Sequence, residues 1–368
     1  MPSVLLIVDN MRIGGFQRLA LDQAYMLGSQ SYKVTICVLD SVPESSTPSF
    51  MHTEQNLISS SDIEIIFVGN GLFDQIAGLR RVTGKFPNPK LLLSHSLRAT
   101  LLMSLLRPRF CKRYKLITAI HQLPTMSAPK QRLKRFIYAQ LSFKIVGYSE
   151  AVKSDWDERV SKSWMLRNVI ARKPISVVRN GIFLPRLPVL ENSIELNMVP
   201  RLIYLGRNTS WKGVSTFIEV ASQPSLANFE LLFMVPHSQD VDISTLPTQL
   251  RNRTSVVAGR SIAAYVPRHG DVHLYPANYG NTAKFVESVS LNCLELACLG
   301  IPTLLTKEGL GTWPDLARFK IFLETDWLDF GAVADQVLRV SQRHFTKEEI
   351  AEITSIIDIK NQVEKLLL

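Results

Sequence analysis

Short, uniformly apolar runs recur along the first 180 residues, and segments with helical spacing separate them. Runs that are apolar at every position, rather than at every second one, are typical of parallel strands covered by helices on both faces. The first half therefore predicts a doubly wound α/β domain over residues 1–180. Strands are expected at 4–9, 33–40, 63–69, 90–95, 115–121, 144–149 and 175–180, with helices between them, for example at 15–28, 97–106, 130–143 and 150–158.

A second series of the same kind begins after residue 200. The segment 181–200 contains three prolines and no sustained period, which is typical of a linker. Beyond it, the pattern predicts a second doubly wound domain over residues 201–349. We expect the helical segment at about 350–368 either to extend this domain or to pack back onto the first. Strands of the second domain are expected at 201–207, 229–235, 255–260, 272–277, 301–306 and 320–325.

Length and composition indicate a globular protein of two domains. The chain has 368 residues, of which 46% are hydrophobic and 20% charged. No apolar run approaches the ~20 residues of a membrane-spanning helix, and the N-terminus lacks a basic leader. The four cysteines have no Cys-x-x-Cys spacing, so neither a disulfide framework nor a zinc site is expected. We expect a cytoplasmic protein.

The net charge of +10 is unevenly distributed. Between Asp74 and Glu150 there is no acidic residue, whereas the same interval holds fifteen Lys and Arg residues. Residues 107–115 form a dense basic cluster, and residues 129–143 have the pattern of a basic amphipathic helix. Such a surface attracts anionic lipid headgroups or nucleic acid, although a solvated helix packed on its own domain gives the same pattern. The long acid-free interval favours a polyanionic partner, and we expect peripheral association with the inner face of the plasma membrane.

The stretch FVESVSLNCLELACLGIP (285–302) is apolar enough to be buried but carries two glutamates. Capping residues predict a helix near 289–299. Its few polar residues, Ser288, Asn292 and Glu295, stand at i, i+4 and i+7 and therefore form one narrow stripe. A solvated glutamate on a partly exposed helix is the ordinary alternative. The apolar surroundings favour a stripe that faces an internal cleft.

Glu287 precedes this helix, whose N-terminal N–H groups favour anions such as phosphate. A buried carboxylate without a partner costs several kcal/mol, so Glu287 and Glu295 require hydrogen-bond donors. Carboxylates are poor phosphate ligands but accept hydrogen bonds well from hydroxyl groups. The two glutamates therefore predict a sugar-binding site.

Two βα turns carry further candidate residues. Gly14 and Gly15 come directly before the first helix, where paired glycines allow a backbone to approach a phosphate closely. Arg207 and Lys212 flank a loop before another helix and could clamp a diphosphate. In isolation, two solvated loop cations would be the favoured interpretation, but beside the two glutamates the clamp is favoured. The spacing matches neither Gly-x-Gly-x-x-Gly nor the Gly-x-x-x-x-Gly-Lys phosphate loop, so no nicotinamide cofactor is expected.

Two histidines are expected at strand ends. His121 could hydrogen-bond a sugar hydroxyl or carry a proton, and His95 has the same ambiguity. A strand-end histidine is more often structural. The sequence contains no spacing typical of a nucleophilic triad or a metal site.

Taken in order along the chain, these features resemble the retaining GT-B glycosyltransferases of family 4, which include phosphatidylinositol mannosyltransferases and bacterial polysaccharide glycosyltransferases. The strongest element is Glu-x7-Glu, because seven residues separate Glu287 from Glu295. The resemblance covers nearly the whole chain. Its other elements are the Gly14-Gly15 loop, His121, the Asn180-Gly181 turn, Gly206-Arg207 with Lys212-Gly213, and the strand at 270–277.

The resemblance implies two Rossmann-like domains facing each other across a cleft, with the nucleotide sugar bound by the second. Glu295 would bind the ribose of a UDP- or GDP-linked donor, and Glu287 the hydroxyls of its sugar. Arg207 and Lys212 would hold the diphosphate and stabilise its charge as the sugar leaves, without a metal or other cofactor. The family retains anomeric configuration, by front-face attack within an ion pair.

Other family roles fall on less typical residues. Gly14 and Gly15 would approach the phosphate and acceptor side, and His121 would contact the transferred sugar. The sequence Ser288-Val289-Ser290 replaces the usual glycine-aromatic-glycine run that contacts phosphate. Gln17 and Phe183 each replace a common acidic residue.

The expected activity is sugar transfer to a glycan or lipid-linked acceptor in bacterial cell-surface polysaccharide or glycolipid synthesis. Two alternatives remain. A nucleotide-sugar epimerase of the same fold would need no acceptor. A basic nucleic-acid-binding protein without enzymatic activity is disfavoured, because no aromatic-basic interleaving or reader motif is present, and we expect no nucleic-acid partner.

Overall fold

The computed structural model describes residues 1–42, 44, 58, 62–86, 88–106, 108–121, 128–161, 174–187, 198–258, 262, 265–277 and 289–368. The chain divides into two compact units. Unit 1 consists of Met1–Phe183 together with Ile359–Leu368, and unit 2 consists of Leu184–Asp358. The chain thus enters unit 2 once and returns to unit 1 with its last ten residues.

Within the described residues, unit 1 contains one sheet of seven parallel strands in the order β3-β2-β1-β4-β5-β6-β7. The first strand lies inside the sheet, and successive strands are added first on one side of it and then on the other, as in doubly wound folds. The strands are β1 (Ser3–Val8), β2 (Lys33–Val38), β3 (Ile63–Phe67), β4 (Pro89–Ser94), β5 (Ile117–Ile120), β6 (Lys144–Gly147) and β7 (Ile175–Val177).

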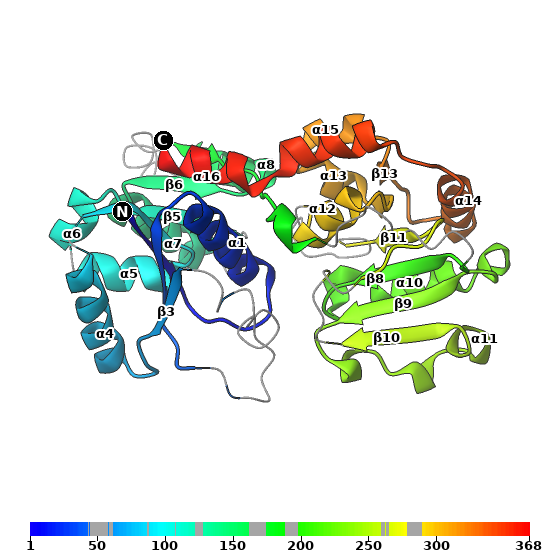
Figure 1. Ribbon diagram of the computed structural model, residues 1–368, viewed down its shortest axis with the longest axis horizontal. Helices are drawn as coiled ribbons and strands as arrows, with labels where there is room; N and C mark the ends of the chain where they lie inside the picture. The colour runs from blue at the N-terminus through cyan, green and yellow to red at the C-terminus, as the bar shows by residue number, and fades with distance from the viewer. Residues whose placement is uncertain are drawn as a thin grey trace. The chain divides into compact units, whose positions relative to one another are not determined.

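Helices connect and cover this sheet (Figure 1). Apolar side chains of β1, β2 and β4 pack with those of α4 and α5 in one buried cluster that includes Leu5, Leu79 and Met103. The helices are α1 (Gly15–Ser29), α4 (Leu72–Lys85), α5 (Leu97–Leu106), α6 (Pro108–Arg113), α7 (Ala128–Leu141), α8 (Glu150–Ser161) and α16 (Ile359–Leu367).

The C-terminal residues form two helices with different partners. The first, α15 (Lys347–Ile357), packs on α12 (Leu291–Cys298) of unit 2, and the extended backbone of Asp358 ends it. The second, α16, packs on α1 of unit 1. A buried amide network holds it there, since Gln23 Nε2 donates to Gln362 Oε1 (2.9 Å) and Gln362 Nε2 donates to the backbone carbonyl of Arg179 (3.0 Å).

Within the described residues, unit 2 contains one sheet of six parallel strands in the order β10-β9-β8-β11-β12-β13. This is the same doubly wound order as in unit 1, with β8 in the place of β1. The strands are β8 (Arg201–Leu205), β9 (Glu230–Val235), β10 (Thr254–Ala258), β11 (Val272–Tyr275), β12 (Thr303–Leu305) and β13 (Phe322–Glu324).

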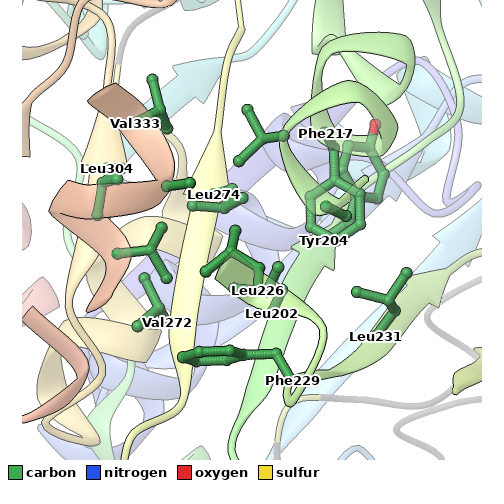
Figure 2. Close-up of a cluster of buried hydrophobic side chains, with 14 of the residues drawn as sticks. Leu202, Tyr204, Phe217, Leu226, Phe229, Leu231, Val272, Leu274, Leu304 and Val333 are labelled. Carbon is green, nitrogen blue, oxygen red and sulfur yellow. The ribbon is translucent and has the colours of Figure 1, made fainter. Parts of the chain in front are cut away.

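Alternate residues of these strands face two helical layers, because side chains alternate across a sheet. Leu202 and Tyr204 pack with α10 and α14, as Figure 2 shows for Phe217 and Val333 of those helices, whereas Ile203 packs with Leu296 of α12. Both sheet faces are therefore apolar, which explains the uniformly apolar strand pattern. The other α-helices among the described residues of unit 2 are α10 (Val214–Ala221), α11 (Thr248–Arg251), α13 (Lys307–Gly311) and α14 (Phe330–Ser341). The 3₁₀ helices are η1 (Leu184–Arg186), η3 (Ser210–Lys212), η4 (Pro224–Leu226), η5 (Ser238–Asp240), η6 (Ile243–Thr245) and η8 (Pro314–Arg318).

The predicted fold class, two doubly wound parallel α/β sheets, is confirmed. Strand ends differ from the prediction by a few residues. For example, the strand expected at 115–121 begins at Ile117, because Lys115 has a left-handed backbone conformation (φ 53°) that a strand does not accommodate. Among the helices that the structure describes, none combines the length and apolar character that crossing a bilayer requires.

Candidate functional site

Each sheet has one point where the strand order reverses, and ligands of such folds bind outside the carboxyl ends of the strands at that point. In unit 1 the reversal lies between β1 and β4, and in unit 2 it lies between β8 and β11. We call these the unit 1 switch point and the unit 2 switch point. Both predicted cations and both predicted glycines follow the first strand of their unit, so they lie at these two places.

At the unit 2 switch point, the loop after β8 is tied to the end of β11. Lys212 Nζ donates a hydrogen bond of 2.6 Å to the hydroxyl of Tyr275, the last residue of β11. Lys212 is half-buried. The bond fixes an ammonium group above the carboxyl ends of two neighbouring strands, where it can meet an anion.

Gly213 brings the same loop against β11 at a second point. Its backbone is left-handed (φ 74°), and a Cβ at this position would lie 2.8 Å from both Cγ and the carbonyl oxygen of Pro276. Any other residue would be strained and would clash. Glycine therefore allows the loop to close on the strand end and to place Lys212.

Arg207 lies in the same loop with its backbone fixed and its side chain exposed. The hydroxyl of Tyr204 donates to the Arg207 carbonyl (2.8 Å), and Asn208 Nδ2 donates to the Asp240 carbonyl beyond the end of β9 (2.6 Å). The Arg207 guanidinium makes no hydrogen bond or ion pair with the described residues. It is thus a cation held close to Lys212 by its backbone and available to a ligand.

Helix α12 begins beside this loop. Asn292 Nδ2 donates to the carbonyl of Leu205, the last residue of β8 (3.1 Å), and the side chain of Ser290 caps the helix by accepting from Cys293 N. Val289 is buried, and its N–H donates to Thr312 Oγ1 (3.1 Å), so this amide is already used inside the protein. The family resemblance places Ser288, Val289 and Ser290 where the family contacts phosphate, and of these Ser288 lies outside the described residues.

Glu295 is buried in α12, with only 1% of its surface exposed. It is three residues after Asn292, so it lies on the same side of the helix one turn further from the loop. Its charge acts on Cys298, whose thiol pKa is raised to about 12, mainly by burial and in part by Glu295 and Asp358. Glu287, the first glutamate of the predicted pair, lies outside the described residues.

A buried histidine stands behind Lys212. His273 of β11 is fully buried, and its Nδ1 lies 3.2 Å from Thr303 Oγ1. Burial, and to a smaller extent the positive charge of Lys212, lowers the His273 pKa to about 3. His273 is therefore neutral at physiological pH, and the positive charge near it is that of Lys212 in the loop after β8.

At the unit 1 switch point, an acid and a hydroxyl join the two central strands. Ser96, which follows β4, donates through Oγ to Asp9 Oδ1 beyond the end of β1 (2.6 Å). Gly14 caps α1 and Gly15 begins it, and a Cβ on Gly15 would meet nothing within 4 Å. Gln17 is buried, and its Nε2 donates to Asn10 Oδ1 (2.8 Å), which closes the turn.

His121 and His95 end the adjacent strands β5 and β4 and contact each other. His95 Nδ1 lies 3.0 Å from His121 Nε2, and the two rings stack at 5.2 Å. Phe16 and Tyr148 also contact the His121 ring, with centroid distances of 5.4 and 4.6 Å. Since Phe16 follows Gly15, the glycine turn and His121 meet at one edge of unit 1.

The structure adds residues that the sequence analysis missed. Tyr275, Asp9 and Ser96 all stand at or just beyond the carboxyl end of a strand. Polar residues at those positions are the signal that could have found them. Among the described residues, no group of three or more His, Cys, Asp or Glu side chains could hold a metal ion.

The basic part of unit 1 divides into buried and exposed portions. Arg135 of α7 is buried and paired with Asp155, so this residue of the expected basic helix serves the interior. Exposed cations instead lie on α4 and α6, and the whole of α6 falls within the expected cluster at 107–115. Five exposed cations on these helices form no ion pair with the part of the chain that the structure describes, namely Arg80, Arg81, Arg109, Lys112 and Arg113.

Solved structures with the same fold cover essentially the whole chain. Sucrose-phosphate synthase from Thermosynechococcus elongatus matches with a TM-score of 0.68 at 14% identity, over 100% of this chain and 97% of its own. WaaG, a glycosyltransferase involved in lipopolysaccharide biosynthesis, matches with a TM-score of 0.60 at 14% identity, over 99% and 98%. An alpha-glucosyltransferase in complex with UDP and a 13-mer DNA matches with a TM-score of 0.60 at 11% identity, over 100% of both chains.

Neither a protein-family model nor a curated protein sequence matches the chain. The structural matches establish that its two sheets have the fold of GT-B glycosyltransferases.

Proposed function

We propose that the protein is a retaining glycosyltransferase that moves a sugar from a UDP- or GDP-linked donor to a glycan or lipid-linked acceptor. The observation that carries this proposal is the arrangement at the unit 2 switch point. There, Arg207 and Lys212 present two cations beside the start of α12, and Glu295 lies buried one turn into that helix. A diphosphate needs the cations, and a ribose needs the carboxylate.

The cations would also carry the chemistry. When the bond between the sugar C1 and the diphosphate oxygen breaks, negative charge grows on the diphosphate, and groups already fixed in place stabilise it best. Tyr275 fixes the Lys212 ammonium group, whereas at Arg207 only the backbone is fixed and the exposed guanidinium would order on the diphosphate. The acceptor oxygen then bonds to C1 on the face that the diphosphate leaves, and its proton passes to the departing phosphate oxygen.

The three fold relatives support this reaction class. One is named a synthase of sucrose phosphate, one acts in lipopolysaccharide biosynthesis, and one was solved with UDP. Together with the Glu-x7-Glu spacing of residues 287 and 295, these similarities favour a role in the synthesis of bacterial cell-surface polysaccharide or glycolipid.

A thermal-shift panel of UDP, GDP, ADP and their sugars tests the proposal. We expect one nucleotide to raise the Tm of the wild-type protein, and Glu295→Gln to abolish that rise. Glu308→Gln is the matched control, because Glu308 is an exposed carboxylate of unit 2, and it should respond as wild type does. If no nucleotide moves the Tm of the wild-type protein, the proposal is wrong.

Product analysis separates transfer from epimerisation. A transferase consumes the donor in proportion to added acceptor, whereas an epimerase of the same fold converts it with no acceptor present. A panel of glycan and lipid-linked acceptors, followed by mass spectrometry of the products, decides between them.

We also propose that unit 1 docks on an anionic membrane surface through α4 and α6. Exposed cations lie there beside exposed apolar side chains, including Leu105 and Phe143, and Lys115 Nζ lies 5.2 Å from the Phe143 ring centre. Cations flanking partly exposed apolar groups are typical of peripheral contact with anionic headgroups. This would place the enzyme at the cytoplasmic face of the membrane.

Sedimentation with vesicles tests this contact. Wild-type protein should co-sediment with vesicles that contain phosphatidylglycerol and much less with pure phosphatidylcholine. The triple variant Arg109→Gln, Lys112→Gln, Arg113→Gln should lose this preference. Equal partitioning to both vesicle types would refute membrane docking, and tighter binding to duplex DNA than to the anionic vesicles would show that the surface serves nucleic acid instead.

A further inference from the structure

The hydrogen bond between His95 and His121 holds one proton between two ring nitrogens. His95 Nδ1 and His121 Nε2 are 3.0 Å apart, at the ends of strands that pair side by side. Either nitrogen can be the donor, because a neutral imidazole has one N–H and one bare nitrogen. The choice determines which nitrogen of His121 remains for a ligand.

Both rings are neutral at physiological pH. Burial lowers the His95 pKa to about 3, and burial together with the neighbouring His95 places the His121 pKa well below its usual value. The rings that surround His121, those of Phe16 and Tyr148, carry no charge. The pair therefore has two protons in total, of which one lies in the shared hydrogen bond.

The surroundings of His95 distinguish the two arrangements. Only 3% of its surface is exposed, and its Nε2 is buried with no hydrogen-bond partner in the structure described. If His121 donates to His95, the second His95 nitrogen carries a buried N–H without an acceptor. If His95 donates through Nδ1, its Nε2 is unprotonated and carries only an unused lone pair. Orphaned buried N–H groups are rarer and more costly than unused acceptors, so the second arrangement is favoured.

We infer that His95 is a positioning residue that holds His121 in its Nδ1–H tautomer, so that His121 offers a neutral N–H to an oxygen of the sugar substrate. His121 is partly exposed, and its Nδ1 has no hydrogen-bond partner among the described residues. That this oxygen belongs to a sugar rests on the proposed function, whereas the assignment of the His121 tautomer does not.

The surrounding side chains restrict the orientation of the His121 ring and therefore the direction of its Nδ1–H bond. The His121 ring is held against three rings, those of Phe16, His95 and Tyr148. Tyr148 is itself fixed, because Gln23 Nε2 donates to its hydroxyl (3.2 Å) and also to Gln362 of α16. The last helix of the chain thus supports the orientation of His121.

This tautomer excludes one role and assigns another. With its Nε2 accepting from His95 and its Nδ1 already protonated, His121 has no nitrogen left to remove a proton from a hydroxyl. It is a hydrogen-bond donor that selects an oxygen acceptor, not a general base.

Nitrogen-15 NMR of the histidine rings at pH 7.5 tests the tautomer without any substrate. We expect His121 to show a protonated Nδ1 and a bare Nε2 in the wild-type protein. In His95→Asn, the side-chain amide stands where His95 Nδ1 stood and should preserve that tautomer. His95→Phe keeps a ring but has no donor, and should allow the Nε2–H form to appear. A wild-type His121 with its proton on Nε2, or with two protons, overturns the inference.

Turnover measurements give an independent readout with matched variants. His121→Asn retains a donor at the Nδ1 position and should keep substantially more activity than His121→Gln, whose amide lies at the Nε2 position. His95→Phe should lower kcat roughly 10-fold to 100-fold, as for other partners that orient a functional imidazole, and His95→Asn should restore most of it. Equal activity of His95→Asn and His95→Phe would contradict a positioning role. Nucleotide binding by the wild-type protein tests the proposed function separately.

Discussion

The two switch points have the same strand topology but opposite chemistry. In unit 2, the loop after the first strand presents Arg207 and Lys212, and a tyrosine of the neighbouring strand fixes the lysine. In unit 1, the corresponding positions carry Asp9 bonded to Ser96 and, one strand further, a neutral histidine pair. One strand order thus carries cations at the edge in unit 2 and uncharged or acidic side chains at the edge in unit 1.

This difference shows where function lies in such folds. The strand order places both edges outside the carboxyl ends of the central strands. The side chains at those ends, and not the sheets, decide what is bound. Diphosphate binding is therefore proposed for unit 2 and the orientation of a sugar oxygen for unit 1, and separate variants can disrupt each of them.

The largest effect is expected from Lys212→Met, which removes the ammonium group but keeps most of the side-chain volume. Loss of one fixed group that stabilises a leaving group typically lowers kcat by about 10²–10³-fold. Steady-state kinetics with the preferred donor measure it. Lys320→Met removes an exposed cation elsewhere in unit 2 and should leave kcat unchanged; a comparable loss in this control would show that net charge, not position, matters.

Gly213→Ala should be the next most damaging change, because it strains a left-handed backbone and places a Cβ against Pro276. We expect a loss of about 1–3 kcal/mol in the free energy of unfolding, measured by chemical denaturation. Gly15→Ala in unit 1 has open space for its Cβ and should stay within ~0.5 kcal/mol of wild type. Equal stability of the two variants would mean that the unit 2 loop is not closed on its strand.

Tyr275→Phe removes only the hydroxyl that Lys212 donates to. A hydrogen bond from a charged group contributes about 1.5–3 kcal/mol, and since the lysine itself remains, we expect the lower end, about a 10-fold fall in kcat/KM. The measurement is donor kinetics at fixed acceptor concentration. An unchanged kcat/KM would show that Lys212 needs no positioning.

The last comparison concerns one buried histidine from each unit and the pH dependence of stability. Burial lowers the pKa of both His95 and His273 to about 3, so each is neutral in the folded protein but binds a proton on unfolding below its unfolded value of about 6.5. The unfolded state then binds more protons, and stability falls as the pH drops from about 6.5 toward 3, by about 1.4 kcal/mol per pH unit for each histidine.

Denaturation midpoints between pH 4 and 6 measure this slope. His273→Asn should flatten it for unit 2 and His95→Asn for unit 1, each by about the contribution of one group. A slope that neither variant changes would mean that these histidines are protonated in the folded protein.

Much of the fold could be predicted, because parallel strands covered on both faces are apolar throughout. Each predicted strand, from residues 4–9 to 320–325, has its counterpart in the structure. The helix α4, which mixes apolar and basic residues over Leu72–Lys85, was not among the helices named from the sequence. The break between α15 and α16 also escaped prediction, because it depends on the extended backbone of one residue, Asp358.

The candidate site was less accessible to the sequence. Arg207 and Lys212 were identifiable from their place after a strand, but the tyrosine that holds Lys212 comes from a strand more than sixty residues later. The same is true of His95 and His121, which were recognised singly although the proposed positioning of His121 depends on their contact across two strands. Such contacts arise from strand order, which apolar periodicity does not specify.

A direct calorimetric titration of UDP and of GDP into three proteins tests the central claim, that the unit 2 switch point binds the diphosphate. One nucleotide should bind wild type and His121→Asn with the same Kd, whereas Lys212→Met should bind it about 10-fold or more weakly. Binding that Lys212→Met leaves unchanged, or that His121→Asn weakens as strongly, would contradict the account.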